Sequence, residues 1–151
     1  MGKLIKKVAR LVLTSTICTL VLVSTAFAYD AQSVSFSFDG NGTNTGGVDG
    51  SSNGKYYSLT TGNVTLALTN TISGGTSTIP SDGLECSVIL YRERFGADKD
   101  YGYRKILYTS EGNSTTSRWV VDTDSTDYYL YVTGGNAFHY DSQGTFYDYY
   151  R

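Results

Sequence analysis

Histidine, cysteine and proline are scarce in this sequence. Its 151 residues include one histidine, two cysteines and one proline. Zinc and other transition-metal sites draw mainly on histidine and cysteine, so no such site is expected. A Ser-His-Asp or Cys-His catalytic set would have to use His139, which lies between Phe138 and Tyr140 in a segment typical of a strand. No pair of carboxylates stands out for hydrolysis either. The sequence therefore predicts no catalytic residues and a protein that is not an enzyme.

Long hydrophobic runs are also few. The one clear run extends from Leu11 to Val23 and contains several threonines. A membrane-spanning helix needs about 20 mostly apolar residues, so this run is too short and too polar for a stable anchor. Four basic residues precede it, Lys3, Lys6, Lys7 and Arg10, and the small-residue site Ala26-Phe27-Ala28 follows it. This order is typical of a secretory signal peptide.

The predicted signal peptide covers residues 1–28 and is cleaved after Ala28, with Ala26 and Ala28 as the recognition residues. Residues 29–151 then form a single domain that is secreted, extracellular and, from the lysine-rich start, of bacterial character. No membrane anchor remains after cleavage. Nothing in the sequence predicts the oligomeric state.

Basic charge is low once the signal peptide is removed. Four of the 12 Lys and Arg residues lie in residues 1–28, whereas all 14 Asp and Glu residues lie beyond it, so the mature domain carries a net charge of −6. Nucleic-acid-binding proteins present clustered basic residues. The mature domain has no such cluster, so nucleic acid is excluded as a predicted partner.

An internal disulfide is excluded because Cys18 leaves with the signal peptide and Cys86 remains alone. Cys86 shares the alternation of Leu84, Val88 and Leu90 and is therefore expected on the buried face of a strand. Pairing with a cysteine of another chain is the alternative.

After the signal peptide, which is predicted to be helical, helical periodicity is absent, whereas alternation of apolar and polar residues is common. β-Branched and aromatic residues dominate short segments, and turn residues separate these about every 8–12 residues. We predict an all-β domain of about eight short strands, an antiparallel β-sandwich or jelly roll, with a small closed β-barrel as the alternative. Short turns from residue 84 onward predict a meander. The segments are Ser33–Phe38, Lys55–Leu59, Asn63–Thr69, Leu84–Phe95, Tyr101–Ser110, Ser117–Val121, Tyr128–Thr133, Ala137–Tyr140 and Thr145–Tyr150.

Oxygen-bearing side chains cluster in the turn after Val121. Asp122, Asp124 and Asp127 make this acidic turn the best candidate for calcium, which takes oxygen ligands. Asp is also an ordinary turn former, because its side chain caps nearby backbone groups. The sequence therefore allows calcium at this turn, and we predict no other cofactor.

Tyrosine is abundant, with 14 residues, all in the mature domain. Three pairs alternate along predicted strands, so each pair is expected on one sheet face. Exposed aromatic rows form binding surfaces because tyrosine combines apolar area with a polar tip, although cross-strand packing is the alternative.

We predict a secreted, non-catalytic protein that binds an extracellular or cell-surface glycan or protein, or contributes to an extracellular structure. A secreted toxin or bacteriocin-like protein is the alternative. The candidate binding residues are Tyr101, Tyr103, Tyr129, Tyr131, Tyr147 and Tyr149.

Overall fold

The computed structural model describes residues 29–40, 50–75, 78–134 and 137–149. The predicted signal peptide, and with it the predicted cleavage site, lies outside the described residues. Within them, no helix is long and apolar enough to cross a bilayer.

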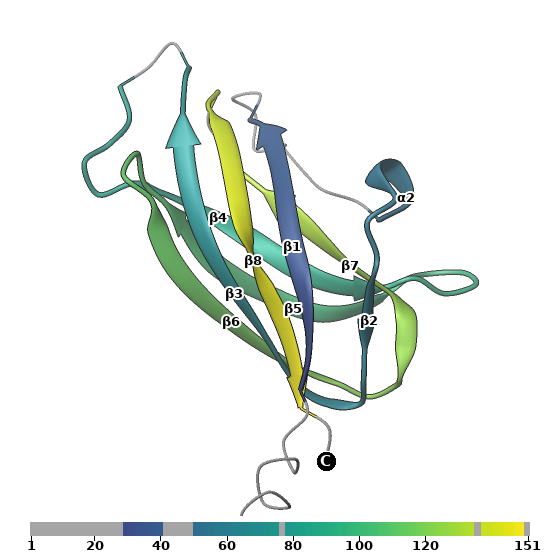
Figure 1. Cartoon of the computed structure of the whole chain (residues 1–151). Coiled ribbons are helices and arrows are strands. Elements are labelled where there is room, and N and C mark those ends of the chain that lie inside the picture. The colour runs from purple at the N-terminus through teal and green to yellow at the C-terminus, as the bar shows by residue number, and fades with distance from the viewer. Residues whose placement is uncertain (1–28, 41–49, 76–77, 135–136, 150–151) are drawn as a thin grey trace, which may run out of the picture.

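The described residues form eight strands and one helical turn, arranged as two four-stranded antiparallel sheets (Figure 1). Sheet A has the order β1-β8-β3-β6, and sheet B has the order β2-β7-β4-β5. This arrangement confirms the predicted antiparallel sandwich. The closed-barrel alternative is wrong, because the strands pair within two separate sheets. The elements are β1 (Tyr29–Asp39), α2 (Gly50–Asn53), β2 (Tyr57–Leu59), β3 (Gly62–Ser73), β4 (Leu84–Arg92), β5 (Lys99–Tyr108), β6 (Asn113–Val121), β7 (Ser125–Thr133) and β8 (His139–Tyr149).

The predicted meander after residue 84 is wrong. Only β4 and β5 pair as a hairpin, and the chain then crosses to sheet A at β6, returns to sheet B at β7 and ends in sheet A at β8. Short connections therefore join strands of opposite sheets. A short turn can join two strands that pair in one sheet or two strands that lie in opposite sheets, so its length alone does not show which strands pair.

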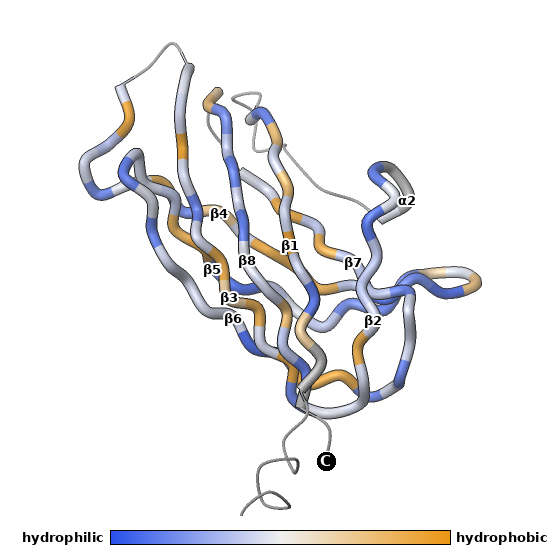
Figure 2. Tube along the Cα trace, viewed as in Figure 1, coloured by the Kyte–Doolittle hydropathy of each residue, from blue (hydrophilic) through white to orange (hydrophobic). Residues whose placement is uncertain are grey.

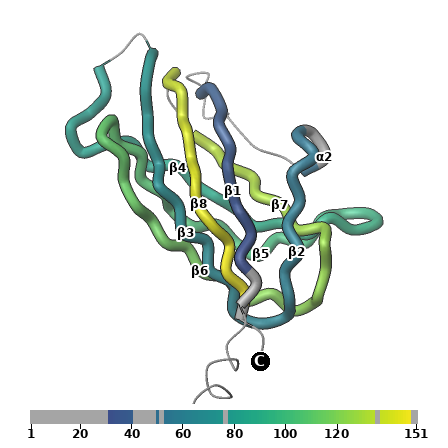
Figure 3. Tube along the Cα trace, in the orientation of Figure 1, coloured from purple at the N-terminus to yellow at the C-terminus, as the bar shows by residue number. Residues whose placement is uncertain are grey.

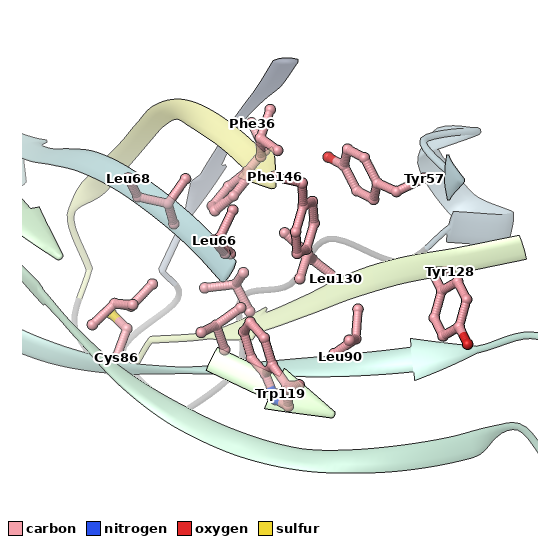
Figure 4. Packing of buried hydrophobic residues seen from close by; sticks show 14 of the residues in the cluster. Phe36, Tyr57, Leu66, Leu68, Cys86, Leu90, Trp119, Tyr128, Leu130 and Phe146 are labelled. Carbon is pink, nitrogen blue, oxygen red and sulfur yellow. The ribbon is translucent and has the colours of Figure 1, made fainter. Parts of the chain in front are cut away.

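The core lies between the two sheets and follows the alternation of each strand. Figure 4 shows Leu66 and Phe146 of sheet A opposite Leu90 and Leu130 of sheet B. Figure 2 shows hydrophobic positions distributed along the strands of both sheets. Cys86 is 3% exposed and belongs to this core, which confirms its predicted burial.

Strand β8 corrects a second prediction. The segment 141–144, expected to be a turn between two strands, pairs continuously with β1 on one side and β3 on the other. Gly144 allows this close pairing, since a Cβ atom there would lie 1.9 Å from the carbonyl oxygen of Ala67. The C-terminal region is therefore one long central strand.

Both ends of the described chain lie at the same end of the sandwich (Figure 3). Tyr29 at the start of β1 stands opposite Tyr149 at the end of β8. The turn between β2 and β3 lies at this end too, as Figure 1 shows.

Candidate binding face

The six tyrosines singled out in the sequence do not form one surface. Tyr129 and Tyr131 lie on the outer face of sheet B, because the alternating residues Tyr128, Leu130 and Val132 are buried in the core. Tyr103 of β5 is 60% exposed. In sheet A, Tyr147 lies between the buried residues Phe146 and Asp148 and so faces away from the core, half-buried. Tyr149 belongs to β8, but its side chain lies outside the described part of the structure.

Tyr101 and Tyr103 were expected on one face, and that expectation is wrong. Ile89 pairs with Tyr103 and Tyr91 pairs with Asp100, so Tyr101 and Gly102 together stand opposite one residue of β4. This two-to-one arrangement is a β-bulge, and Gly102 supplies the positive φ of 87°. The extra residue reverses the alternation. Tyr101 therefore packs against the core, with its ring centroid 5.6 Å from that of Tyr128.

A cluster of four tyrosines covers the outer face of sheet B beside β2. We call it the tyrosine face: Tyr56, Tyr91, Tyr129 and Tyr131. Tyr91 stacks on Tyr129 at 5.4 Å between centroids, and Tyr131 meets Tyr91 edge-on at 6.5 Å. Tyr56 meets Tyr129 edge-on at 6.2 Å. Such offset and edge contacts are the favourable geometries for aromatic rings, and they fix the four side chains relative to one another.

Tyr129 is the support of this cluster rather than its exposed part. It is only 7% exposed, whereas Tyr56 is 37% exposed and Tyr131 is half-buried. Burial, together with the nearby carboxylates of Asp100 and Asp98, raises the pKa of Tyr91. Its hydroxyl therefore stays protonated at neutral pH and remains a hydrogen-bond donor.

The loop between β4 and β5 is tied to the tyrosine face by two hydroxyl groups. Tyr56 donates a hydrogen bond to Glu93, and Tyr129 donates one to Asp98 Oδ2 at 2.7 Å. The loop also closes on itself. The backbone N–H of Arg94 donates to Asp98 Oδ1 at 3.2 Å, and the Arg94 guanidinium donates to the Ala97 carbonyl oxygen at 3.0 and 3.2 Å. These contacts hold the loop in one shape.

Phe95 projects from the tip of this fixed loop and is fully exposed. A single exposed apolar side chain is common on protein surfaces, so the interest of Phe95 lies in the aromatic and charged groups beside it. Phe95, Tyr56 and Tyr91 were not among the residues predicted from the sequence. The available signal was one phenylalanine in an otherwise charged and glycine-containing turn, Arg92-Glu93-Arg94-Phe95-Gly96.

An open pocket of about 680 Å³ lies between this loop and the tyrosine face. Two aromatic rings and three charged groups line it, so it can pack against a flat apolar surface while hydrogen bonding to hydroxyl groups. Its lining residues are Tyr56, Glu93, Arg94, Phe95, Gly96 and Asp127.

The three aspartates of the acidic turn have separate partners. Asp122 contacts Lys99 and accepts a hydrogen bond from Tyr101 at 2.6 Å, and the Lys99 contact holds its pKa well below the usual range. Asp124 accepts two hydrogen bonds from Thr61, which lower its pKa. Asp127 accepts hydrogen bonds from the hydroxyls of Ser125 and Thr126, the two residues before it. Among the described residues, no three His, Cys, Asp or Glu side chains are placed to share a metal ion. Calcium at this turn stays a prediction.

His139 lies between two carboxylates at the start of β8. Nδ1 is 2.6 Å from Asp39 Oδ1, and Nε2 is 3.2 Å from Asp141 Oδ2. The hydrogen bond with Asp39 raises the pKa of His139. Both ring nitrogens are thus engaged with carboxylates, and Cys86 is a buried residue of the other sheet. The geometry describes a surface histidine held between two carboxylates.

No protein-family model and no curated protein matches this sequence. Among solved structures, one described as "CBM4 structure and function" is similar with a TM-score of 0.42 and 9% identity, over 60% of this chain and 58% of that one. The N-terminal cellulose-binding domain of β-1,4-glucanase C from Cellulomonas fimi is similar with a TM-score of 0.49 and 10% identity, over 82% of this chain and 90% of that one. This chain thus spans little more than half of the first of these structures. Similarity at this level assigns no function to the chain.

Proposed function

We propose that this protein is a secreted, non-catalytic β-sandwich that binds an extracellular glycan through the tyrosine face and the loop that carries Phe95. The observation that carries the proposal is the fully exposed Phe95 on a loop held by hydrogen bonds, beside an open pocket of about 680 Å³. A loop already fixed before binding loses little conformational entropy when a ligand docks, so the exposed ring can contribute most of its contact energy to affinity.

The groups around the pocket suit a hydroxyl-rich ligand. The apolar face of a sugar ring packs on a flat aromatic ring such as Phe95 or Tyr56. Sugar hydroxyls donate to carboxylates and accept from guanidinium groups, and Glu93, Asp127 and Arg94 supply both kinds of partner at the same pocket. A purely apolar surface would favour a protein partner instead, because the centres of protein interfaces are depleted in charged residues.

The proposal is tested by glycan-array binding of the 29–151 protein, followed by titration of the best ligand against variants. Phe95→Ala is the most informative change, because Phe95 is fully exposed and its removal should not affect folding. Loss of one aromatic contact of about 1.4 kcal/mol lowers affinity about tenfold. Tyr131→Ala tests the tyrosine face at a position more accessible than Tyr129.

Val120→Ala is the matched control. Val120 is 69% exposed on β6 of sheet A, an exposed apolar residue on the other sheet. We expect unchanged affinity for this variant and weakened binding for the other two, with equal thermal midpoints for the Phe95 and Val120 variants. Unchanged binding in both test variants contradicts the proposal. Absence of any glycan ligand, with growth inhibition of other cells by the same protein, would favour the toxin alternative.

A further inference from the structure

A buried carboxylate at the end of the sandwich lacks one partner. Asp148 of β8 is 1% exposed, and its Oδ2 accepts hydrogen bonds from the backbone N–H and hydroxyl of Thr60 at 2.7 and 2.8 Å. Its Oδ1 is buried and has no hydrogen-bond partner among the described residues. An unmatched buried anionic oxygen is strongly unfavourable, so a donor or cation is expected beside it.

Asp148 lines a pocket of about 300 Å³, together with Asp124 and residues 58–60. Asp124 binds Thr61 in the same way that Asp148 binds Thr60, through both the backbone N–H and the hydroxyl. Two carboxylates therefore hold neighbouring threonines at one pocket. This concentration of negative charge favours a positively charged occupant.

Strand pairing places the start of β1 beside Asp148. Asp30 of β1 stands opposite Asp148 of β8 in the register. The residue before Asp30 is Tyr29, the first residue of the predicted mature chain, and consecutive strand residues are about 3.3 Å apart.

We infer that the α-ammonium group of Tyr29, created when the signal peptide is removed, binds the unpartnered carboxylate oxygen of Asp148 and completes the fold. In the precursor, the nitrogen of Tyr29 belongs to a neutral amide. A signal peptidase hydrolyses the Ala28–Tyr29 bond: water supplies OH to the Ala28 carbonyl carbon and H to the Tyr29 nitrogen, which then takes up a proton. The start of β1 lies at this end of the sandwich, beside the end of β8 (Figure 3).

The occupant is the chain's own amino terminus because the same segment is already linked to this pocket. Gln32, three residues after Tyr29, forms two hydrogen bonds with the backbone of Ser58, one at 2.9 Å and one from its amide nitrogen to the carbonyl oxygen. Ser58 lines the pocket that Asp148 lines. Strand β1 is thereby held at the pocket just after the point where the mature chain begins.

The test uses the 29–151 protein, which contains every buried core residue from Val34 to Phe146. One form carries a free α-amino group on Tyr29 and the other carries an acetyl group there, which removes the charge at nearly equal length. We expect acetylation to lower the thermal midpoint by about 3–8 °C. In Asp148→Asn, which retains an acceptor for Thr60, acetylation should change the midpoint little. Asp82→Asn, at an exposed turn position, is the control and should respond as the wild type does.

A second measurement does not depend on stability. Amine-reactive labelling of the folded protein, located by mass spectrometry, should modify the Tyr29 amino group much more slowly than in Asp148→Asn. Equal labelling rates, an equal effect of acetylation in both backgrounds, or a secreted protein that does not begin at Tyr29 would overturn the inference. Restoration of the midpoint of the acetylated form by calcium would assign the pocket to a metal ion instead. None of these measurements depends on glycan binding, so this inference and the proposed function succeed or fail separately.

Discussion

A buried polar network connects the two sheets and gives the most quantitative prediction. Tyr108 of β5, Ser142 of β8 and Asn70 of β3 are each at most 1% exposed. Ser142 donates its hydroxyl hydrogen to Asn70 Oδ1 at 2.8 Å, so the Tyr108 hydroxyl, 2.7 Å away, is the donor to Ser142 Oγ. Asn70 in turn donates to Thr115 at 2.8 Å. Burial raises the pKa of Tyr108, which keeps its hydroxyl protonated.

The direction of these hydrogen bonds sets the expected free energies. Tyr108→Phe removes a donor and leaves one acceptor partly unfilled, so it should lower the free energy of unfolding by about 1 kcal/mol. Ser142→Ala leaves both the Tyr108 hydroxyl and Asn70 Oδ1 without a partner, and the loss should be about 3 kcal/mol. The double variant leaves only Asn70 Oδ1 unmatched, so its loss should be about 2 kcal/mol, less than for Ser142→Ala alone.

Urea unfolding followed by fluorescence measures these differences, because Trp119 is the one tryptophan and is 2% exposed in the folded protein. The decisive quantity is the effect of Tyr108→Phe measured in the Ser142→Ala background. A further loss of about 1 kcal/mol there, as in the wild type, would show that the two hydroxyls act independently and would refute the network.

Two further predictions concern backbone packing and pH. Gly144→Ala should destabilise the protein by about 3 kcal/mol or more, because its Cβ would overlap the Ala67 carbonyl oxygen in the middle of sheet A. Gly96→Ala, where nothing lies within 4 Å of the added Cβ, should lose only about 1 kcal/mol through its positive φ, and equal losses would contradict the packing argument. The raised pKa of His139, caused first by its hydrogen bond to Asp39, means that its stabilising charge is fully present below about pH 6.5 and is lost as pH rises through the folded-state pKa. Thermal midpoints across this range should fall less steeply in His139→Gln, and an NMR titration of the ring with a midpoint at or below about 6.5 would contradict the assignment.

Local alternation predicted which residues face inward along most strands. Val64, Leu66 and Leu68 of β3 are buried, as are Val88 and Leu90 of β4 beside Cys86. Period-two patterning is a local property of the strand, so the sequence alone determines it once one face is apolar. The scarcity of histidine and cysteine likewise limits the chemistry open to this chain, because it is a property of composition and holds for any fold.

Local alternation did not predict the surface that we propose for binding. Tyr56 lies outside any strand, Tyr91 was one residue within a long strand, and Phe95 was expected at the edge of a turn. These residues meet because β4 pairs with β7 and because Tyr56 and Tyr129 bind the β4–β5 loop through Glu93 and Asp98. Contacts between segments far apart in the chain depend on strand order, and the sequence of a single segment does not determine that order.

By itself, the sequence determined the class of the domain, the inward face of most strands and the burial of Cys86. The tertiary structure decided strand order, the continuity of β8 through Gly144, and the bulge at Gly102 that turns Tyr101 and Tyr103 to opposite sides. It also placed Asp148 opposite the start of β1. The reason is physical: side-chain alternation depends on neighbours along the chain, whereas pairing, bulges and buried polar contacts depend on which distant strand lies alongside.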